Sequence, residues 1–405
     1  MTRHRAVERA DREAVLERQR ALKMAKSAHA YVRGNTLKFY EWLDGLPRGT
    51  LPEGPPIWIC GDCHLGNLGP LADADGEVAI QIRDLDQTVI GNPSHDLVRL
   101  GLSLASAARG SNLPGVVTAR MLEEMVRGYG DGLKSRDGAR DGDGEPPEPD
   151  AVRTIRHRAL GRRWKHLARE RLEDEDLKIP RGRRFWALDD DEHEALDALF
   201  HEDAVRELVL AIDGRHAGEA RVRLLDAAYW MKGCSSLGFL RYAALLRIDE
   251  RGEKPRLALV DLKEAVAAAA PQAPKAKMPK DPAERVVAGA RALSPHLGER
   301  MLPARILGKP VVVRELLPQD LKLDVDQFSR GEAVRAARYL AHVVGAAHGR
   351  QMKRSARAAW RRAVTRGASA DGAPSWLWSS VVELAGRHEV GYLEHCRSYA
   401  DAEAA

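Results

Sequence analysis

Polar residues that could carry chemistry gather in "IWICGDCHLGNLGP", residues 57–70. Cys60 and Cys63 form a C-x-x-C-H string, and Asp62 and Asn67 share a Gly-punctuated loop. The cysteines are compatible with covalent haem attachment, a zinc site or a redox pair. Carboxylate and amide oxygens are instead suited to magnesium, and a carboxylate can orient a hydroxyl group. Features elsewhere in the sequence distinguish between these chemistries.

The cysteine chemistries find little support outside this segment. Cys234 and Cys396 are the other cysteines, too few for a disulfide scaffold and too isolated to complete a zinc knuckle. Covalent haem attachment normally happens outside the cytoplasm. We expect a cytoplasmic protein, because the first residues carry frequent charges and no apolar run is long enough to span a membrane. A redox pair would begin a helix, whereas two glycines and a proline follow here.

The composition predicts a chain with more than one domain or lobe. Its 405 residues are 44% hydrophobic and 30% charged, which provides a core but exceeds one ordinary domain. The formal net charge of +5 suits phosphorylated ligands and does not require nucleic acid. For the basic residues 152–184 we expect a solvated helical face, with a surface for anionic ligands or nucleic acid as the alternative.

The elements around the loop predict where its side chains lie. "IWIC" is typical of a short buried strand. The Asp75-Gly76 turn and the alternation over residues 78–82 then predict a hairpin whose last strand ends at Asp84 and Asp86. Adjacent strands deliver their ends to one edge, so we expect Asp84 to lie close to the Asp62 loop. A helix follows, entered through Ser94 or Asp96.

A second group of strands is predicted after residue 226, joined by a turn between Gly233 and Gly238 that contains Ser235 and Ser236. This turn is not a P-loop, because no Lys-Ser or Lys-Thr pair follows its second glycine. A later strand ends on Lys263, and a helix over residues 283–293 follows. Two glutamates, Glu264 and Glu284, are alternative partners for this lysine.

Phosphoryl transfer needs what these segments contain: oxygen ligands for magnesium, a carboxylate for the acceptor, a lysine for the phosphates and a Gly-rich turn. The block from residue 61 to 97 resembles the catalytic segment of protein-kinase-like phosphotransferases such as aminoglycoside phosphotransferases and choline kinases. The matching positions are Gly61-Asp62-x-His64-x-x-Asn67, a hairpin, Asp84-Leu85-Asp86, Gly91 and Asp96-Leu97.

The resemblance implies a role for each of these residues. Asp62 would be the catalytic base, Asn67 and Asp84 would bind magnesium with Asp86 as an auxiliary ligand, and Lys263 would contact the α- and β-phosphates. Further residues would support the loop or the nucleotide: His64 as a brace, Asp96, Arg33 as a phosphate contact or a structural ion pair, and Glu315 to Leu317 as an adenine-binding hinge.

The order of the parts implies a circular permutation, because the predicted lysine follows the catalytic loop instead of preceding it. A helix ending at His348 resembles the one that directly precedes the catalytic loop in those enzymes. We therefore expect an α+β, two-lobed, protein-kinase-like fold. Residues 1–225, with a flexible insert at 135–151, and residues 319–405 would form a mainly helical C-lobe, and residues 226–318 a small antiparallel β N-lobe.

Most of the chain is similar to the uncharacterised bacterial domain-of-unknown-function family 2252. Taken together, the resemblances imply an ATP- and Mg²⁺-dependent phosphotransferase acting on an unknown hydroxyl acceptor, either a small molecule or a protein. An AMP transferase on the same fold and a non-catalytic, nucleotide-binding pseudokinase remain alternatives. A nucleic-acid-binding protein that uses residues 152–184 is the alternative outside the nucleotide-binding class.

Overall fold

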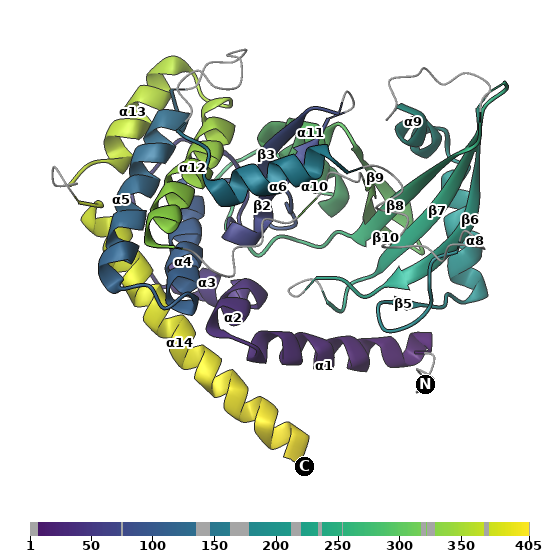
Figure 1. Ribbon diagram of the computed structural model, residues 1–405, viewed down its shortest axis with the longest axis horizontal. Helices are drawn as coiled ribbons and strands as arrows, with labels where there is room; N and C mark the ends of the chain where they lie inside the picture. The colour runs from purple at the N-terminus through teal and green to yellow at the C-terminus, as the bar shows by residue number, and fades with distance from the viewer. Residues whose placement is uncertain are drawn as a thin grey trace.

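The protein is an α+β structure with a helical half and an antiparallel sheet half (Figure 1). The computed structural model describes residues 7–73, 76–134, 146–162, 178–211, 220–233, 237–252, 254–316, 321, 329–367 and 372–404. The α+β class predicted from the sequence is confirmed. Within these ranges, every helix is too short or too polar to cross a membrane.

The sheet half is one antiparallel sheet in the order β5-β6-β7-β8-β10-β9. Its strands are β5 (Phe185–Trp186), β6 (Arg221–Trp230), β7 (Arg241–Asp249), β8 (Arg256–Glu264), β9 (Met301–Ile306) and β10 (Lys309–Glu315). Apolar side chains of α8 (Asp190–Phe200) and α9 (Asp203–Ala211) share a buried cluster with one face. The sheet half thus includes β5, α8 and α9, which come before residue 226 in the chain. The predicted domain boundary between residues 225 and 226 falls inside β6.

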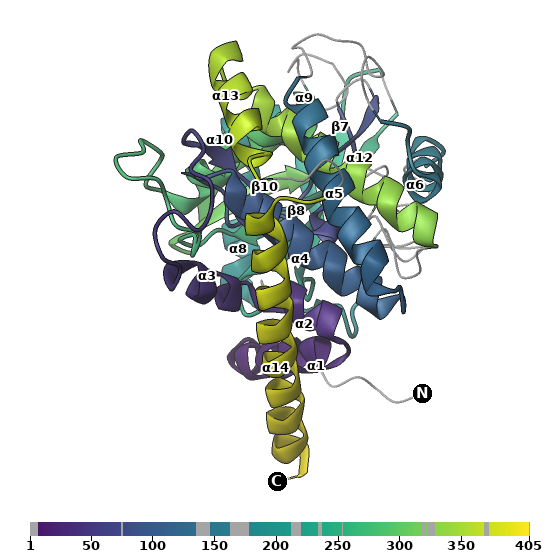
Figure 2. The same cartoon turned by 90° about the vertical axis from the view of Figure 1, so that its left-hand side faces the viewer.

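Two separate stretches of the chain build the helical half. Before the sheet come α4 (Ser94–Gly110), α5 (Gly115–Gly132) and α6 (Asp150–Leu160), and after it come α12 (Arg330–Gly349), α13 (Arg354–Val364) and α14 (Ser375–Ala404). Their apolar faces share one buried cluster, which includes Leu97, Tyr129 and Leu340. The C-terminal part of α14 extends beyond the body of the molecule (Figure 2).

Short strands and one helix lie between the halves. Strand β1 (Ile57–Ile59) pairs with β4 (Val89–Gly91), and β2 (Leu68–Ala72) pairs with β3 (Val78–Ile82). Helix α10 (Pro282–Leu293), followed by the short α11 (Pro295–Gly298), joins them to the sheet. Its buried Arg285 donates to the carbonyl oxygens of Thr88, Asp86 (2.9 Å) and Val266 (2.9 Å). This side chain therefore binds the segment after β3 to the residues after β8.

The N-terminal residues form consecutive helices: α1 (Arg12–Ala25), α2 (Ala28–Gly34) and α3 (Thr36–Asp44), preceded by the 3-10 turn η1 (Arg9–Asp11). Side chains of Ser27 and Asn35 accept backbone N–H groups at the starts of α2 and α3 and so separate the helices. Helix α1 is mostly exposed or half-buried, and Arg12 and Leu16 are its buried residues. Arg12 donates to Glu192 of α8, so α1 is anchored on the sheet half and runs toward the helical half (Figure 1).

Helices α5 and α12 pack with their backbones in direct contact at Gly128, Gly132 and Gly345. A Cβ atom at Gly345 would overlap the carbonyl group of Tyr129, and one at Gly132 would overlap that of His342. Backbone carbonyls in packed helices cannot yield as a flexible side chain can. These glycines therefore set the spacing between the two helices.

We expect Gly345→Ala to lower the free energy of unfolding by about 2 to 3 kcal/mol, because the added methyl group overpacks the contact between the helices. Urea unfolding followed by circular dichroism measures this. Gly386→Ala on the exposed side of α14 is the matched control, since a Cβ there meets nothing within 4 Å. It should stabilise the protein by about 0.5 to 1 kcal/mol. Equal effects of the two substitutions would contradict the close packing.

Candidate functional site

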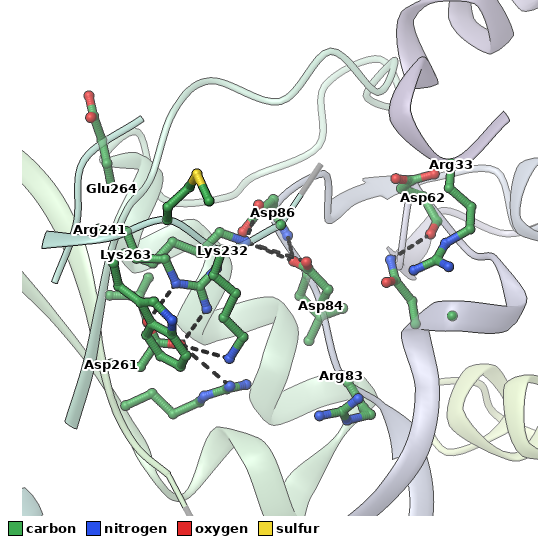
Figure 3. A pocket seen from close by; sticks show the side chains of 18 of the residues that line it. Arg33, Asp62, Arg83, Asp84, Asp86, Lys232, Arg241, Asp261, Lys263 and Glu264 are labelled. Atoms are coloured by element: carbon green, nitrogen blue, oxygen red, sulfur yellow. Dashed lines mark hydrogen bonds and ion pairs between the residues drawn. The ribbon is translucent and has the colours of Figure 1, made fainter. Parts of the chain in front are cut away.

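A cavity of about 890 Å³ lies between the sheet and the loops at the edge of the helical half. It is lined by six of the residues that the sequence analysis placed at the catalytic centre: Asp62, His64, Asn67, Asp84, Asp86 and Lys263. Figure 3 shows Asp84 and Asp86 between two groups of side chains, with Lys263 and Arg241 on one side and Asp62 and Arg33 on the other. The structure therefore brings the predicted centre together from both halves.

The loop after β1 turns sharply at Gly61, whose φ is +78°. A Cβ atom there would overlap the carbonyl oxygen of Gln87, so both the backbone conformation and the space require glycine. The carboxylate of Asp96 accepts hydrogen bonds from the N–H groups of Cys60 (2.8 Å) and Gly61 (2.9 Å). Asp96 thus holds the backbone of the loop that carries Asp62, in agreement with its predicted supporting role.

Asp96 of α4 is itself held by a buried chain of side chains from three other helices. The indole N–H of Trp360 donates to the hydroxyl of Tyr129 (2.7 Å), which lies 3.0 Å from Nδ1 of His348. Nε2 of His348 lies 3.1 Å from Asp96. A carboxylate can only accept, so Nε2–H of His348 donates to Asp96. In the neutral imidazole Nδ1 is then the acceptor, and it accepts from the Tyr129 hydroxyl. The sequence resemblance had singled out His348, whereas Tyr129 and Trp360 carry no signal in it.

Asp62 is a buried carboxylate that both lines the cavity and binds the protein behind it. Its Oδ1 accepts from Nε of Arg99 (2.7 Å), and its Oδ2 accepts from the hydroxyl of Thr36 (2.9 Å). Desolvation by itself raises the pKa of Asp62, but the Arg99 guanidinium, His64 and the two hydrogen bonds outweigh it and hold the pKa below its ordinary value. Such an ionised carboxylate is well suited to orienting a hydroxyl group.

Asn67 ends the 3-10 turn η2 (Leu65–Asn67), directly before β2. Its amide nitrogen donates to the carbonyl oxygen of Asp62 (3.1 Å), which leaves the amide oxygen as the atom that could bind a metal. Its own backbone oxygen accepts from the N–H of Arg83 (2.7 Å). The hairpin therefore places Asn67 opposite the residue before Asp84.

Lys263 of β8 reaches across the cavity to the end of β3. Its Nζ lies 3.2 Å from Asp84 Oδ1 and also forms an ion pair with Asp86. Desolvation by itself raises the pKa of Asp84, but the charges of Lys263 and Arg241 outweigh it and hold this pKa well below its usual range. At Asp86, desolvation and then the charge of Asp84 raise the pKa to about 6. The two carboxylates thus share one ammonium group.

A cluster of cations on the sheet was not predicted from the sequence. Asp261 of β8 binds Arg241 in bidentate fashion (2.8 and 2.5 Å), with Lys232 and Arg314 at 4.0 and 3.6 Å. The available signal was the spacing of Asp261 and Lys263, two residues apart and so on one face of β8. Arg241 and Arg314 come from the neighbouring strands, and only the strand register shows that they join this face.

The predicted pairing of Lys263 with Glu284 or Glu264 was wrong. Glu284 is exposed on α10 and does not line the cavity, because the neighbouring Arg285 and Val286 point inward instead. Glu264 lines the cavity but pairs with Lys309 (2.9 Å) and accepts from the N–H of Leu240. The short Asp84 and Asp86 side chains take its place beside the lysine.

The remaining predicted nucleotide contacts are placed as follows. Gly233 and Gly238 both have positive φ values, and Gly233 lines the cavity and accepts from Nζ of Lys23 (2.7 Å). Glu315 is buried at the end of β10 without lining the cavity, whereas its neighbour Arg314 does line it. Ser235, Ser236, Leu317 and most of the flexible insert predicted at 135–151 lie outside the described residues.

The two loop cysteines are buried free thiols. The hydrogen bond between the two thiols, in which Cys60 keeps its proton, and desolvation raise the pKa of Cys60 well above its usual value, which is the reverse of what a redox-active thiol needs. Within the described ranges, no group of three or more His, Cys, Asp or Glu side chains is placed so that it could hold a metal ion. Mg²⁺ can be bound through one or two carboxylates together with phosphates and water, and Asp84, Asp86 and the Asn67 oxygen fit that requirement.

We expect Asp96→Asn to lower the free energy of unfolding by about 3 kcal/mol. The NH2 group of the asparagine would replace one of the two oxygens that accept the loop N–H groups, and two buried donors would then face each other. Urea unfolding measures the change. Asp150→Asn, at an exposed carboxylate, is the control and should stay within about 0.5 kcal/mol of the wild type. A similar small change for Asp96→Asn would contradict the supporting role.

His64 is buried, and desolvation lowers its pKa to about 3. The unfolded chain binds a proton at this residue below about pH 6.5, whereas the folded protein does not until about pH 3. The contribution of the neutral His64 to the free energy of unfolding is therefore fully present above pH 6.5 and is lost as the pH falls toward 3. We expect His64→Gln to flatten the decline of the free energy of unfolding between pH 6.5 and 5 by up to about 1.4 kcal/mol per pH unit. The exposed His193→Gln control should leave the slope unchanged.

Comparisons with known proteins give one family. No curated protein and no solved structure matches the chain. The sequence pattern of one family matches residues 12–398, nearly the whole chain and all of the residues that line the cavity. The chain therefore belongs to domain-of-unknown-function family 2252, whose description is "Uncharacterized protein conserved in bacteria".

Proposed function

We propose that the protein is an ATP- and Mg²⁺-dependent phosphotransferase with a circularly permuted, protein-kinase-like fold. One observation carries the proposal. Nζ of Lys263 lies 3.2 Å from the Asp84 carboxylate across a cavity that Asp62 and Asn67 also line, although 179 residues separate the pair in the chain. A lysine, two candidate magnesium ligands and an ionised carboxylate in one cavity are the parts that phosphoryl transfer uses.

The order of elements in the sheet half supports the kinase-like part of the proposal. Protein kinases carry the phosphate-binding lysine on a third strand, after a Gly-rich turn, and a helix follows that strand. Here β6 and β7 flank the turn with Gly233 and Gly238, β8 carries Lys263, and α10 comes next. The helical half, with Asp62 and Asp84, would correspond to the large lobe, built from the two ends of the chain.

Each residue then has a distinct task. ATP supplies the phosphoryl group, and Mg²⁺ neutralises the phosphate charge. Asp84, Asp86 and the Asn67 oxygen would hold the metal, which would replace the Lys263 ammonium as their counter-charge and leave this lysine to face the phosphates. Asp62 would orient the acceptor hydroxyl. The acceptor oxygen bonds to the γ-phosphorus, ADP leaves, and the hydroxyl proton passes through Asp62 to water.

A thermal-shift titration with ATP tests this proposal. We expect millimolar ATP with Mg²⁺ to raise the melting temperature of the wild type, because ligand binding to the folded state stabilises it. Asp84→Ala should lose the magnesium-dependent part of the shift, and Lys263→Met should lose most of the ATP-dependent part, each measured against the same variant without ligand. Lys254→Met, at an exposed lysine before β8, is the matched control and should respond as the wild type does.

ATP labelled on the α- or the γ-phosphate then identifies the reaction. Label carried from the γ position onto the acceptor, with the α label left in ADP, supports phosphoryl transfer. Label carried from the α position onto the acceptor, with the γ label leaving in pyrophosphate, would show AMP transfer. Nucleotide binding that persists without metal and without transfer of either label would favour a pseudokinase. No ATP-induced shift at millimolar concentration would overturn the kinase-like proposal altogether.

A further inference from the structure

The cations around the cavity differ in how their charge is balanced. Ten Lys or Arg side chains line the cavity against five Asp or Glu side chains, counted over the described residues. On the sheet side, the single carboxylate of Asp261 lies among Arg241, Lys232 and Arg314, and Asp84 and Asp86 pair with Lys263. The other lining cations come from the end of α1, from α2, from the end of β3 and from the residues before β5: Lys23, Lys26, Arg33, Arg83, Arg183 and Arg184. Among the side chains labelled in Figure 3, the carboxylate drawn beside Arg33 is that of Asp62.

Asp62 does not balance the charge of Arg33, because its carboxylate is already paired. The fully buried Arg99 holds Asp62 at 2.7 Å. The same guanidinium donates to the carbonyl oxygen of Val32 (2.7 Å), the residue directly before Arg33. Arg99 thus both neutralises Asp62 and fixes the last turn of α2, so the position of Arg33 is tied to that of the catalytic carboxylate.

Arg33 lies flat against the catalytic loop. A Cβ atom at Gly66 would come within 2.7 Å of its Cζ and Nη2 atoms, so glycine is needed there for the guanidinium to rest on the loop between Asp62 and Asn67. Its Nε is buried and has no hydrogen-bond acceptor among the described residues. Because this atom is shielded from the cavity, the donors that an oxyanion in the cavity can reach are the terminal N–H groups of the guanidinium.

The histidines near Arg33 neither add to its charge nor offset it near pH 7. Desolvation, followed by the charges of Arg33 and Arg99, lowers the pKa of His29 to about 4. Desolvation also lowers the pKa of His64, to about 3, so both side chains are neutral near pH 7. Among the described residues, no carboxylate forms an ion pair with Arg33.

We propose that Arg33 forms an acceptor subsite that binds an oxyanion, so that the hydroxyl acceptor of this enzyme is itself anionic, with a phosphate or carboxylate group. The inference rests on the proposed phosphotransferase function. An acceptor hydroxyl has to reach Asp62, and Arg33 is the cation that the loop holds beside it (Figure 3). Its planar fork of N–H donors matches a carboxylate or a phosphate, which then carries the hydroxyl to Asp62.

Isothermal titration tests the subsite while a non-hydrolysable ATP analogue and Mg²⁺ saturate the nucleotide site. The probes are inorganic phosphate and malonate, with glycerol as the neutral comparison. We expect one or both oxyanions to bind the wild type at millimolar concentration, glycerol not to bind, and Arg33→Gln to weaken oxyanion binding by about tenfold or more. The stronger of the two probes identifies the group as phosphate or carboxylate.

Two controls separate the subsite from the nucleotide site. Arg251→Gln removes one exposed positive charge outside the cavity and should leave oxyanion binding unchanged. Affinity for the ATP analogue with Mg²⁺ should be similar in Arg33→Gln and the wild type and much lower in Lys263→Met. Each variant is first compared with the wild type by circular dichroism.

Three results would overturn the inference: no oxyanion binding, undiminished binding in Arg33→Gln, or a loss of nucleotide affinity in Arg33→Gln as large as in Lys263→Met. The last would assign Arg33 to the nucleotide phosphates. Failure of the proposed function looks different, because then the ATP analogue does not bind the wild type at all. Phosphate binding that is lost in Arg33→Gln and kept in Lys263→Met would still support an oxyanion subsite in that case.

Discussion

The buried carboxylate of Asp96 is the interaction on which the site depends. It accepts the N–H groups of Cys60 and Gly61 and so determines where the backbone turns before Asp62. Neither donor could be left unpaired at this depth without a large cost in free energy. The chain from Trp360 through Tyr129 and His348 to Asp96 then connects helices from both ends of the sequence to this turn. The helical half is thereby a rigid support for one short loop.

Lys263 plays a corresponding role between the halves. It is the contact by which the sheet reaches the two aspartates at the end of β3, and its ammonium group neutralises part of their mutual repulsion. Arg285 binds the same segment through backbone oxygens, and α1 is anchored on the sheet side through Arg12. A ligand cation on the aspartates would weaken the Lys263 contact, so occupancy of the site and the fit between the halves are physically linked.

Charge in the cavity is distributed unevenly for a structural reason. The strands of the sheet place Asp261 among Arg241, Lys232 and Arg314, and this pairing stabilises cations that would otherwise repel one another. Arg33 stands on the other side, beside a carboxylate that Arg99 has already neutralised. Arg33 therefore adds positive charge to the part of the cavity that Asp62 lines.

By itself the sequence determined the local features of the site: the strand before the loop, the hairpin that ends at Asp84 and the strands on either side of the Gly233 turn. Alternation, turn residues and short spacing act over a few positions, and so a pattern can report them. The partner of Lys263, the cation cluster of Asp261 and the chain that holds Asp96 were decided only by the tertiary structure. They join residues up to 252 positions apart, and such contacts follow from strand register and helix packing, which no local pattern encodes.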